Sequence, residues 1–480
     1  MQGTIECKCK LSQWREKAKL RSQEKGALKK RNKEILKSRD LWKEKYKKEK
    51  VLNGLLRKEL LKASKGKVVV TAKGLKPKHH SYSVQIIMLC IWIRQQGNCS
   101  LRSCASMLKI MSLTLNLDFG FPSRNTIQNW EKKLGCYRIG KQGKKGEEWI
   151  LILDESISIG QQKLLLILGV KKNNYKFDSA LTFEEVEVLY MGIDKSWKGA
   201  AISDQIGKIK KRGFSIVYSV SDSGVNLVKG LRMSKVDRIE DCTHAIGNLL
   251  KKEYNSKEEF LSFSKQCGIL KRQVMNSKDT LIMPPTQRVK GRFLNIQPLS
   301  EWAYKMLLLL EKTDGRLSDE QQEKLKWLKN YQTLVLEIYE VCKTMNQLFN
   351  ILKNQGLSNQ SSEACNQILR DSKAANYFKV GVLAYLEKNL KILATPSPVI
   401  CCSDIIESYF GKYKNQLAKT GAQLITDSCL CIANFNQKFD EKEIKQAMEK
   451  IKIVDLKNWR QENLPSSLLQ QKRELLKNVG

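Results

Sequence analysis

WILILDES, residues 149–156, and SIVYSVSDSG, residues 215–224, are the two stretches that decide the fold. Each is a short run of aliphatic and β-branched residues, which is typical of a strand buried on both faces. Each run stops at an acid, Asp154 in the first and Asp222 in the second. We therefore expect a sheet domain that carries two carboxylates at the ends of two of its strands.

Between and after these two acids, the hydrophobic pattern of the sequence changes twice. Residues 162–172 and 181–190 predict two further strands, and residues 198–212 predict a helix. About 150 mostly helical residues follow Asp222, which is enough for a domain of its own. They end at the breaker TPSP, residues 395–398, after which a helix is predicted to return to the sheet.

A third carboxylate, Glu407, lies in the opening of that returning helix, SDIIESYFGKYK. Phosphoryl transfer at two divalent ions needs hard oxygen ligands on both ions. We expect Asp154 to bridge two Mg²⁺ ions, for which Mn²⁺ would substitute, with Asp222 on one ion and Glu407 on the other. The three carboxylates are the predicted catalytic and metal-binding residues.

Each acid also has a purely structural interpretation. Asp154 would simply end a strand, with Glu155 as an equally good ligand, and SDSG around Asp222 is a credible turn. Asp404 and Glu407 have the spacing of a capping box.

DCTH places Asp241 three residues before His244, on one face of a predicted helix start. A carboxylate and an imidazole at this spacing can orient one another near a metal or a phosphate. The alternative is a histidine that is only a satisfied core or cap residue.

The charge balance indicates a polyanionic partner. The 480 residues contain 86 Lys and Arg against 49 Asp and Glu, a formal net charge of +37. Residues 1–80 hold about 26 basic and about 8 acidic side chains, roughly half of the surplus. Double-stranded DNA is favoured over an acidic membrane, because no lipid-anchoring pattern accompanies the charge.

Two N-terminal features favour DNA binding and self-association. In a proline-free basic segment, apolar residues recur at a seven-residue spacing that Arg21 and Glu49 interrupt, at Trp14, Leu28, Ile35, Trp42 and Leu56. This indicates a long helix that forms a coiled coil or lies along DNA; a solvated helix without a partner is the alternative. Three short helical patterns follow, and either form a structural bundle or resemble a helix-turn-helix module. In the latter case the DNA-facing residues are Arg124, Asn125, Gln128, Asn129 and Lys132.

The cysteine and histidine pattern argues against a zinc site. The 14 cysteines include no C-x-x-C pair, and the chain has three histidines. Reduced thiols are typical of intracellular proteins. The longest apolar stretch, residues 84–93, is too short to span a bilayer, and no signal peptide is recognisable. We expect an intracellular protein, in the cytoplasm or nucleoid of a prokaryote or the nucleus of a eukaryote.

SDSGVNLVKGL followed by EDCTHAIGNLLKK resembles the segment around the second acid of DDE transposases with a C/D-x-x-H signature, the Mutator-like, hAT and RAG-type group. SDIIESYFGKYKN resembles the helix that bears their catalytic Glu. The resemblance implies an RNase H-like α/β core interrupted by an all-helical insertion, with Asp154, Asp222 and Glu407 as the metal-binding triad. Asp241 and His244 match the signature, and Trp302 and Trp327 are candidates for stacking on a flipped base.

The resemblance and the composition together predict the domain order. It runs as a basic long helix and possible coiled coil at 1–65, a linker at 66–80, a helix-turn-helix-like domain at 81–140, the first part of the core at 149–244, the insertion at 245–398, the closing helix of the core at 399–437 and a basic helical tail at 438–480.

The expected function is a DNA transposase that cleaves element ends and joins them to target DNA. Holding two ends together implies a homodimer or a larger oligomer. Two alternatives remain: an RNase H-like endonuclease without strand transfer, and a non-catalytic DNA-binding regulator derived from a transposase.

Overall fold

The computed structural model describes residues 75–466 except for 116, 119, 160–161, 289–292, 294–295, 313–315, 393–396 and 420–424, with scattered residues outside that span. The chain divides into two compact units, Met1–Thr71 with Leu115–Asp118, and Ala72–Thr114 with Phe119–Gly480. In the first unit, β1 (Val70–Thr71) pairs in parallel with β2 (Leu117–Asp118). The helix predicted over residues 1–65 falls mostly outside the described residues; described parts of it, such as 38–44, are helical and exposed.

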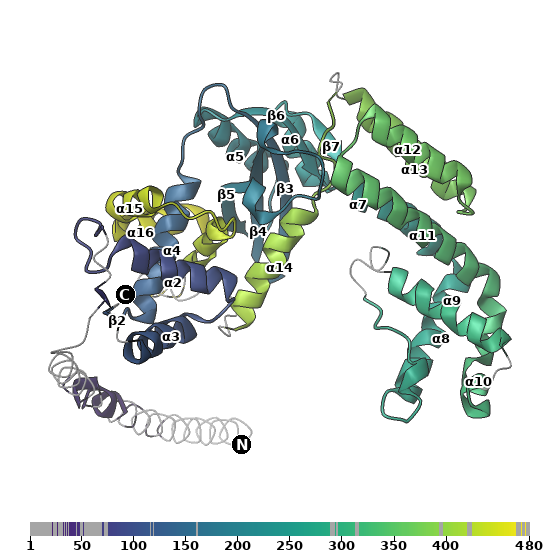
Figure 1. The fold of residues 1–480 in the computed structure, drawn as a ribbon, viewed down its shortest axis with the longest axis horizontal. Coiled ribbons are helices and arrows are strands. Elements are labelled where there is room, and N and C mark those ends of the chain that lie inside the picture. Colours follow the sequence, from purple (N-terminus) through teal and green to yellow (C-terminus); the bar gives the residue numbers. More distant parts are fainter. Residues whose placement is uncertain are drawn as a thin grey trace, which may run out of the picture. The chain divides into compact units, whose positions relative to one another are not determined.

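The centre of the second unit is a mixed five-stranded sheet in the order β5-β4-β3-β6-β7 (Figure 1). Its strands are β3 (Glu148–Ile159), β4 (Gln162–Lys171), β5 (Val186–Asp194), β6 (Ser215–Ser221) and β7 (Arg238–Glu240). The pairs β3–β4 and β4–β5 are antiparallel, whereas β3–β6 and β6–β7 are parallel. This order and these directions are consistent with an RNase H-like core.

The sheet differs from the sequence-based expectation in three strands. β5 begins at Val186 rather than at Leu181, because residues 183–185 form a 3-10 turn, and it continues to Asp194. β3 does not stop at Asp154 but continues to Ile159, because it forms a long antiparallel pairing with β4. β7 was not expected, since three residues are too few to produce an alternating pattern.

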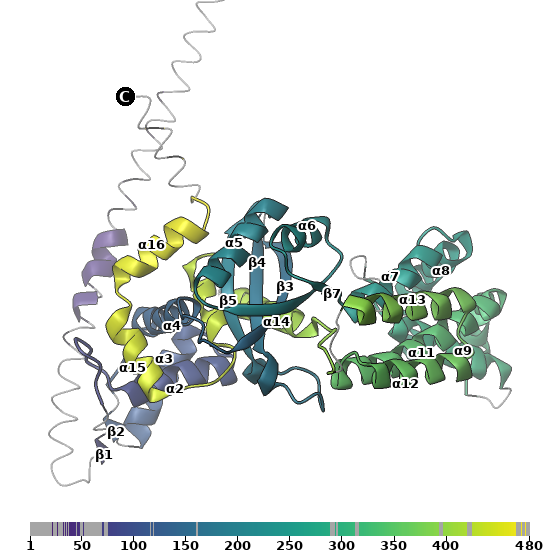
Figure 2. The same cartoon turned by 90° about the horizontal axis from the view of Figure 1, so that it is seen from above.

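Alternation along β3 separates the two faces of the sheet. Trp149, Leu151 and Leu153 belong to a core formed with α5 (Gly199–Lys211) and α6 (Val225–Met233). Figure 2 shows α5 and α6 lying along this face. Ile150 and Ile152 belong to the core of the opposite face. Residues of even number on β3 therefore point away from α5 and α6.

That opposite face carries the helix that follows residues 399–403. α14 (Asp404–Ala418) contributes buried side chains, among them Ile406 and Tyr409, to the same core as Ile150 and Ile152. Asp154, as an even-numbered residue of β3, belongs to the face that α14 covers.

Between β7 and α14 the described chain is helical. The helices are α7 (Cys242–Tyr254), α8 (Glu258–Val274), α9 (Gln297–Glu311), α10 (Asp319–Leu325), α11 (Gln332–Gln355), α12 (Asn359–Asp371) and α13 (Asn376–Ile392), with short 3-10 turns between some of them. α11 packs against α9, α12 and α7, and α13 packs against α7 (Figure 1). Their buried residues join the core on the α14 side of the sheet.

The helices before and after the sheet pack together. α2 (Val84–Gln96), α3 (Leu101–Thr114) and α4 (Arg124–Ile139) contact one another, and α15 (Glu441–Lys450) packs on α2 and α4. A buried ion pair joins α2 to α4: Arg94 Nε lies 3.2 Å from Glu131 Oε1. α16 (Ile453–Asn463) also contacts α4. Thus helices on both sides of the sheet in sequence meet at α4. None of the described helices combines the length and the apolar character needed to cross a bilayer.

α4 approaches the 3-10 helix η6 (Asp427–Asn434) closely at Gly135. A Cβ atom on Gly135 would lie 2.0 Å from the carbonyl oxygen of Leu430. A Cβ atom at Gly207, on α5, would have no neighbour within 4 Å.

We predict that Gly135→Ala and Gly207→Ala have opposite effects on stability. Gly135→Ala forces two backbones apart and should cost about 1–3 kcal/mol or more, whereas Gly207→Ala should stabilise α5 by about 0.5–1 kcal/mol. Thermal or urea unfolding of both variants checks this. Equal effects would contradict the close packing of α4 on η6.

Candidate active site

Strand register brings Asp154 and Asp222 to the same place. β3 and β6 pair in parallel, with Ile150 opposite Tyr218 and Ile152 opposite Val220. Two residues further on, the same register sets Asp154 beside Asp222, which directly follows β6. All four paired residues belong to the core on the α14 side. Both acids therefore lie on the sheet face that α14 covers.

The surroundings of Asp154 raise the pKa of its carboxyl group. Burial, and next the negative charge of Asp222, raise the pKa of Asp154 to about 7, and Glu407 also contributes to the rise. Its Oδ1 accepts a hydrogen bond of 2.7 Å from the backbone N–H of Glu155. Close carboxylates in a partly dry site keep one another protonated unless a cation neutralises them. The predicted alternative ligand, Glu155, instead forms an ion pair of 3.0 Å with Lys163.

Asp222 adopts the turn that SDSG suggested. Its Oδ1 accepts from the backbone N–H of Gly224 at 2.9 Å, and Arg238 donates to its carbonyl oxygen at 2.9 Å. The first bond orients the carboxylate and leaves it free lone pairs, whereas the second holds the backbone of the turn.

Glu407 is not part of a capping box. α14 begins after Ser403, which makes no side-chain cap bond. Asp404 accepts instead from Thr243 Oγ1 at 3.1 Å and pairs with Lys353. Glu407 is 58% exposed, and its Oε1 lies 3.7 Å from His244 Nε2. The carboxylate therefore faces His244 and remains accessible.

Asp241 and His244 connect the sheet to α14. Asp241 is fully buried and caps α7 by accepting from the backbone N–H of His244 at 2.9 Å. Its Oδ2 also lies 2.6 Å from His244 Nδ1, and its Oδ1 accepts from the backbone N–H of Ser403 at 2.8 Å. The hydrogen bond to Asp241, opposed by burial, raises the pKa of His244 to about 9. A charged imidazole is thus held next to Glu407.

Lys414 is a neighbour of the site that the sequence analysis missed. Burial lowers the pKa of Lys414, while the charges of Glu407 and Asp154 oppose that shift. It lies seven residues after Glu407, two turns along α14, so the spacing was the available signal. Gly411 lies between them, and a Cβ there would meet nothing within 4 Å. This side of α14 is therefore open beside the acids.

The five predicted DNA-facing residues differ in how exposed their side chains are. Arg124 and Asn125 are exposed at the start of α4, and Gln128 and Asn129 are half-buried. Lys132 is 12% exposed and pairs with Asp427 at 2.9 Å. Only the first turn of α4 offers open polar side chains among these five.

The two tryptophans considered for base stacking lie in the helical region between β7 and α14. Trp302 on α9 and Trp327 are half-buried and pack against the main core. Trp327 also contacts the rings of Phe263 and Tyr331.

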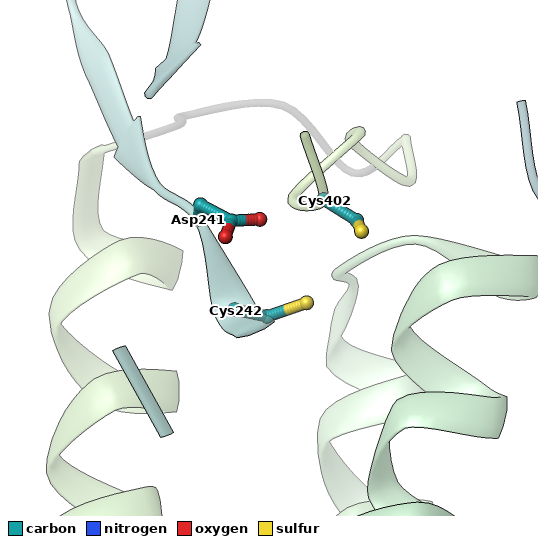
Figure 3. A group of neighbouring side chains, drawn as sticks. All are labelled: Asp241, Cys242 and Cys402. Carbon is teal, nitrogen blue, oxygen red and sulfur yellow. The ribbon is translucent and has the colours of Figure 1, made fainter. Parts of the chain in front are cut away.

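A tight cluster of potential metal ligands lies next to the acids. In the described part of the chain, one group of three such side chains has its ligand atoms within 4.8 Å of one another: Asp241, Cys242 and Cys402 (Figure 3). Asp154, Asp222 and Glu407 do not form such a group.

The chain has a distant structural likeness to known proteins. No family model matches the chain, and no curated protein matches its sequence. Among solved structures, the chain is similar to the Drosophila P element transposase strand transfer complex, with 13% sequence identity and a TM-score of 0.37. The match covers 79% of this chain and 94% of that chain. At this distance the likeness transfers no function, so function must be argued from the residues of this chain.

We predict that Asp241→Asn lowers the pKa of His244 from about 9 toward the ordinary value of 6.5. In the native protein the raised pKa adds stability below pH 6.5, and that stability is lost as the pH rises through 9. With three histidines in the chain, NMR titration of labelled imidazoles follows His244 directly. Asp440→Asn removes another N-cap aspartate and is the control; an unchanged His244 in Asp241→Asn would refute the coupling.

For Asp154 we predict that stability also falls with rising pH, but in a lower pH range, because the fold disfavours the charged form of this carboxyl group. Its pKa is raised from 3.8 to about 7, so the native state loses stability as the pH rises from 4 to 7. In metal-free buffer, Asp154→Asn should therefore gain stability over the wild type, on the order of 2 kcal/mol at pH 8 and little at pH 4. Urea unfolding at both pH values measures this. A pH-independent difference would contradict it; exposed Asp204→Asn is the control.

Proposed function

We propose that this protein is a DNA transposase that uses one carboxylate site for DNA cleavage and strand transfer. The observation that carries the proposal is the convergence of Asp154, Asp222 and Glu407 on one face of the sheet, with the pKa of Asp154 raised by burial and by Asp222. Sites that shift a carboxylate so strongly are typical of function, although structural networks also shift pKa values.

The donor set suits Mg²⁺ or Mn²⁺. Carboxylate oxygens are the preferred ligands of these ions, and a dication would relieve the repulsion between Asp154 and Asp222. Asp154, Asp222 and Glu407 would hold the two ions. When bound, the ions supply charge neutralisation at the entering and leaving oxygens and activation of the nucleophile.

The chain's own residues position this chemistry. Asp241 holds His244, and the imidazolium faces Glu407 at 3.7 Å, where it orients the carboxylate or a phosphate oxygen. Lys414 supplies a further positive charge on the same side of α14. Because Gly411 adds no side chain between Glu407 and Lys414, a DNA backbone can approach α14 closely there.

DNA binding is proposed from charge and from the exposed start of α4. The net charge of +37 favours phosphate contacts whose strength falls with salt. Arg124 and Asn125 are the accessible candidates for base or phosphate contact. The helix-turn-helix role of 81–140, the insertion role of 245–398 and a dimer or larger oligomer remain parts of this proposal.

The decisive experiment is a cleavage and strand-transfer assay on DNA flanking the gene, with Mg²⁺ or Mn²⁺. We predict that wild-type protein yields joined products and that Asp222→Asn and Glu407→Gln each lose at least about 100-fold in rate, because each removes a ligand charge. Asp241→Asn should lose about 10–100-fold, because it acts through His244.

Controls separate the possible outcomes. Glu363→Gln, an exposed carboxylate on α12, should retain full activity, and circular dichroism should show that every variant is folded. Cleavage without joining would identify a hydrolytic nuclease, and DNA binding without cleavage a regulator. Full activity in Asp222→Asn would refute the assigned site.

A further inference from the structure

We infer a second metal site, for a single Zn²⁺ ion held by the thiolates of Cys242 and Cys402 and a carboxylate oxygen of Asp241. The three ligand atoms already lie within 4.8 Å of one another. Figure 3 shows the two sulfur atoms and the carboxylate turned toward a common space. Two sulfurs and one oxygen suit Zn²⁺ and do not suit Mg²⁺. The site shares Asp241 with the proposed active site, where this residue holds His244, but its metal binding can be tested without DNA.

The three ligands are held in place by the backbone. Asp241 N donates to Ser221 O at 3.0 Å, which fixes the start of α7 to the end of β6. Cys242 N donates to Cys401 O at 2.8 Å, and Ser403 N donates to Asp241 Oδ1 at 2.8 Å. Cys402 thus lies between two anchored residues. A site organised in this way needs little rearrangement to bind an ion.

The sulfur atoms of Cys242 and Cys402 make weak polar contacts in this structure. Both cysteines are free. Their contacts with Thr243 Oγ1, at 4.0 Å from Cys242 and 3.7 Å from Cys402, are weak. The alternative is a pair of buried core thiols beside an aspartate that already accepts hydrogen bonds from the backbone N–H groups of His244 and Ser403. The metal site is favoured by geometry, because both sulfurs and a carboxylate oxygen lie within 4.8 Å of one another.

Charge and space both permit the ion. Two thiolates and one carboxylate with Zn²⁺ leave a net charge of −1, which suits the ammonium of Lys353 close to Asp404. A cavity of about 40 Å³ is lined by Cys402 but not by Asp241 or Cys242, and it has room for a water molecule on the Cys402 side of the cluster. On binding, two Zn–S bonds form and two thiol protons pass to solvent.

The site joins two segments that are distant in sequence. Cys242 begins α7, whereas Cys402 lies five residues before Glu407. Zn²⁺ at this point would fix the start of α14 to the end of the sheet. The lack of a C-x-x-C pair argued against a zinc site, because such a spacing reveals only ligands that are close together along the chain.

The test is Co²⁺ titration of the full chain, reduced and free of oxygen. We expect one equivalent to give a sulfur-to-cobalt charge-transfer band that Zn²⁺ abolishes, and Zn²⁺ to raise the melting temperature. Cys242→Ser and Cys402→Ser should each lose the band. Cys267→Ser, which removes a buried cysteine of α8, and the Cys7→Ser/Cys9→Ser double variant should keep it.

Two results would overturn the site: no charge-transfer band with the wild type, or an undiminished band in both Cys242→Ser and Cys402→Ser. If those variants fail to fold, cadmium-113 NMR of the wild type decides, because its chemical shift reports the number of sulfur ligands. Two sulfurs support the site, and none or four refute it. No DNA is needed, so failure here is distinguishable from failure of the transposase proposal.

Discussion

The buried carboxylate of Asp241 is the interaction on which the rest of the site depends. It accepts hydrogen bonds from the backbone N–H groups of His244 and Ser403 and contacts the His244 ring. An aspartate at zero exposure is tolerated only when its oxygens are fully bonded. By satisfying it, the fold joins the end of β7, the start of α7 and the start of α14. The position of Glu407 follows from this junction.

The junction also explains why the sheet alone is not the site. β3 and β6 supply Asp154 and Asp222 through register, and both acids are present once the strands pair. The third carboxylate arrives on a helix that follows about 150 residues of other structure. Its approach is fixed by bonds to the segment 401–403 rather than by strand pairing. Loss of these bonds would leave two of the three acids in place.

Burial and neighbouring charges shift the pKa values of the site residues in different directions. Burial and Asp222 favour protonated Asp154, whereas Asp241 favours a charged His244. The imidazolium and Lys414 partly offset the acids before any metal or DNA is present. These positive charges reduce the repulsion among the three carboxylates, and Glu407 remains accessible.

The sequence by itself determined the strands around the two aspartates, the helix of residues 198–212 and the mostly helical chain that follows Asp222. These depend on local hydrophobic patterns, which the sequence displays directly. Only the tertiary structure decided which acids face one another, because side-chain direction depends on strand register and on where α14 packs. It likewise set Asp154 on the sheet face that α14 covers and paired Glu155 with Lys163. It also paired Lys132 with Asp427 and brought Cys242 close to Cys402. Contacts between distant segments arise from packing of the whole chain, so no local pattern encodes them.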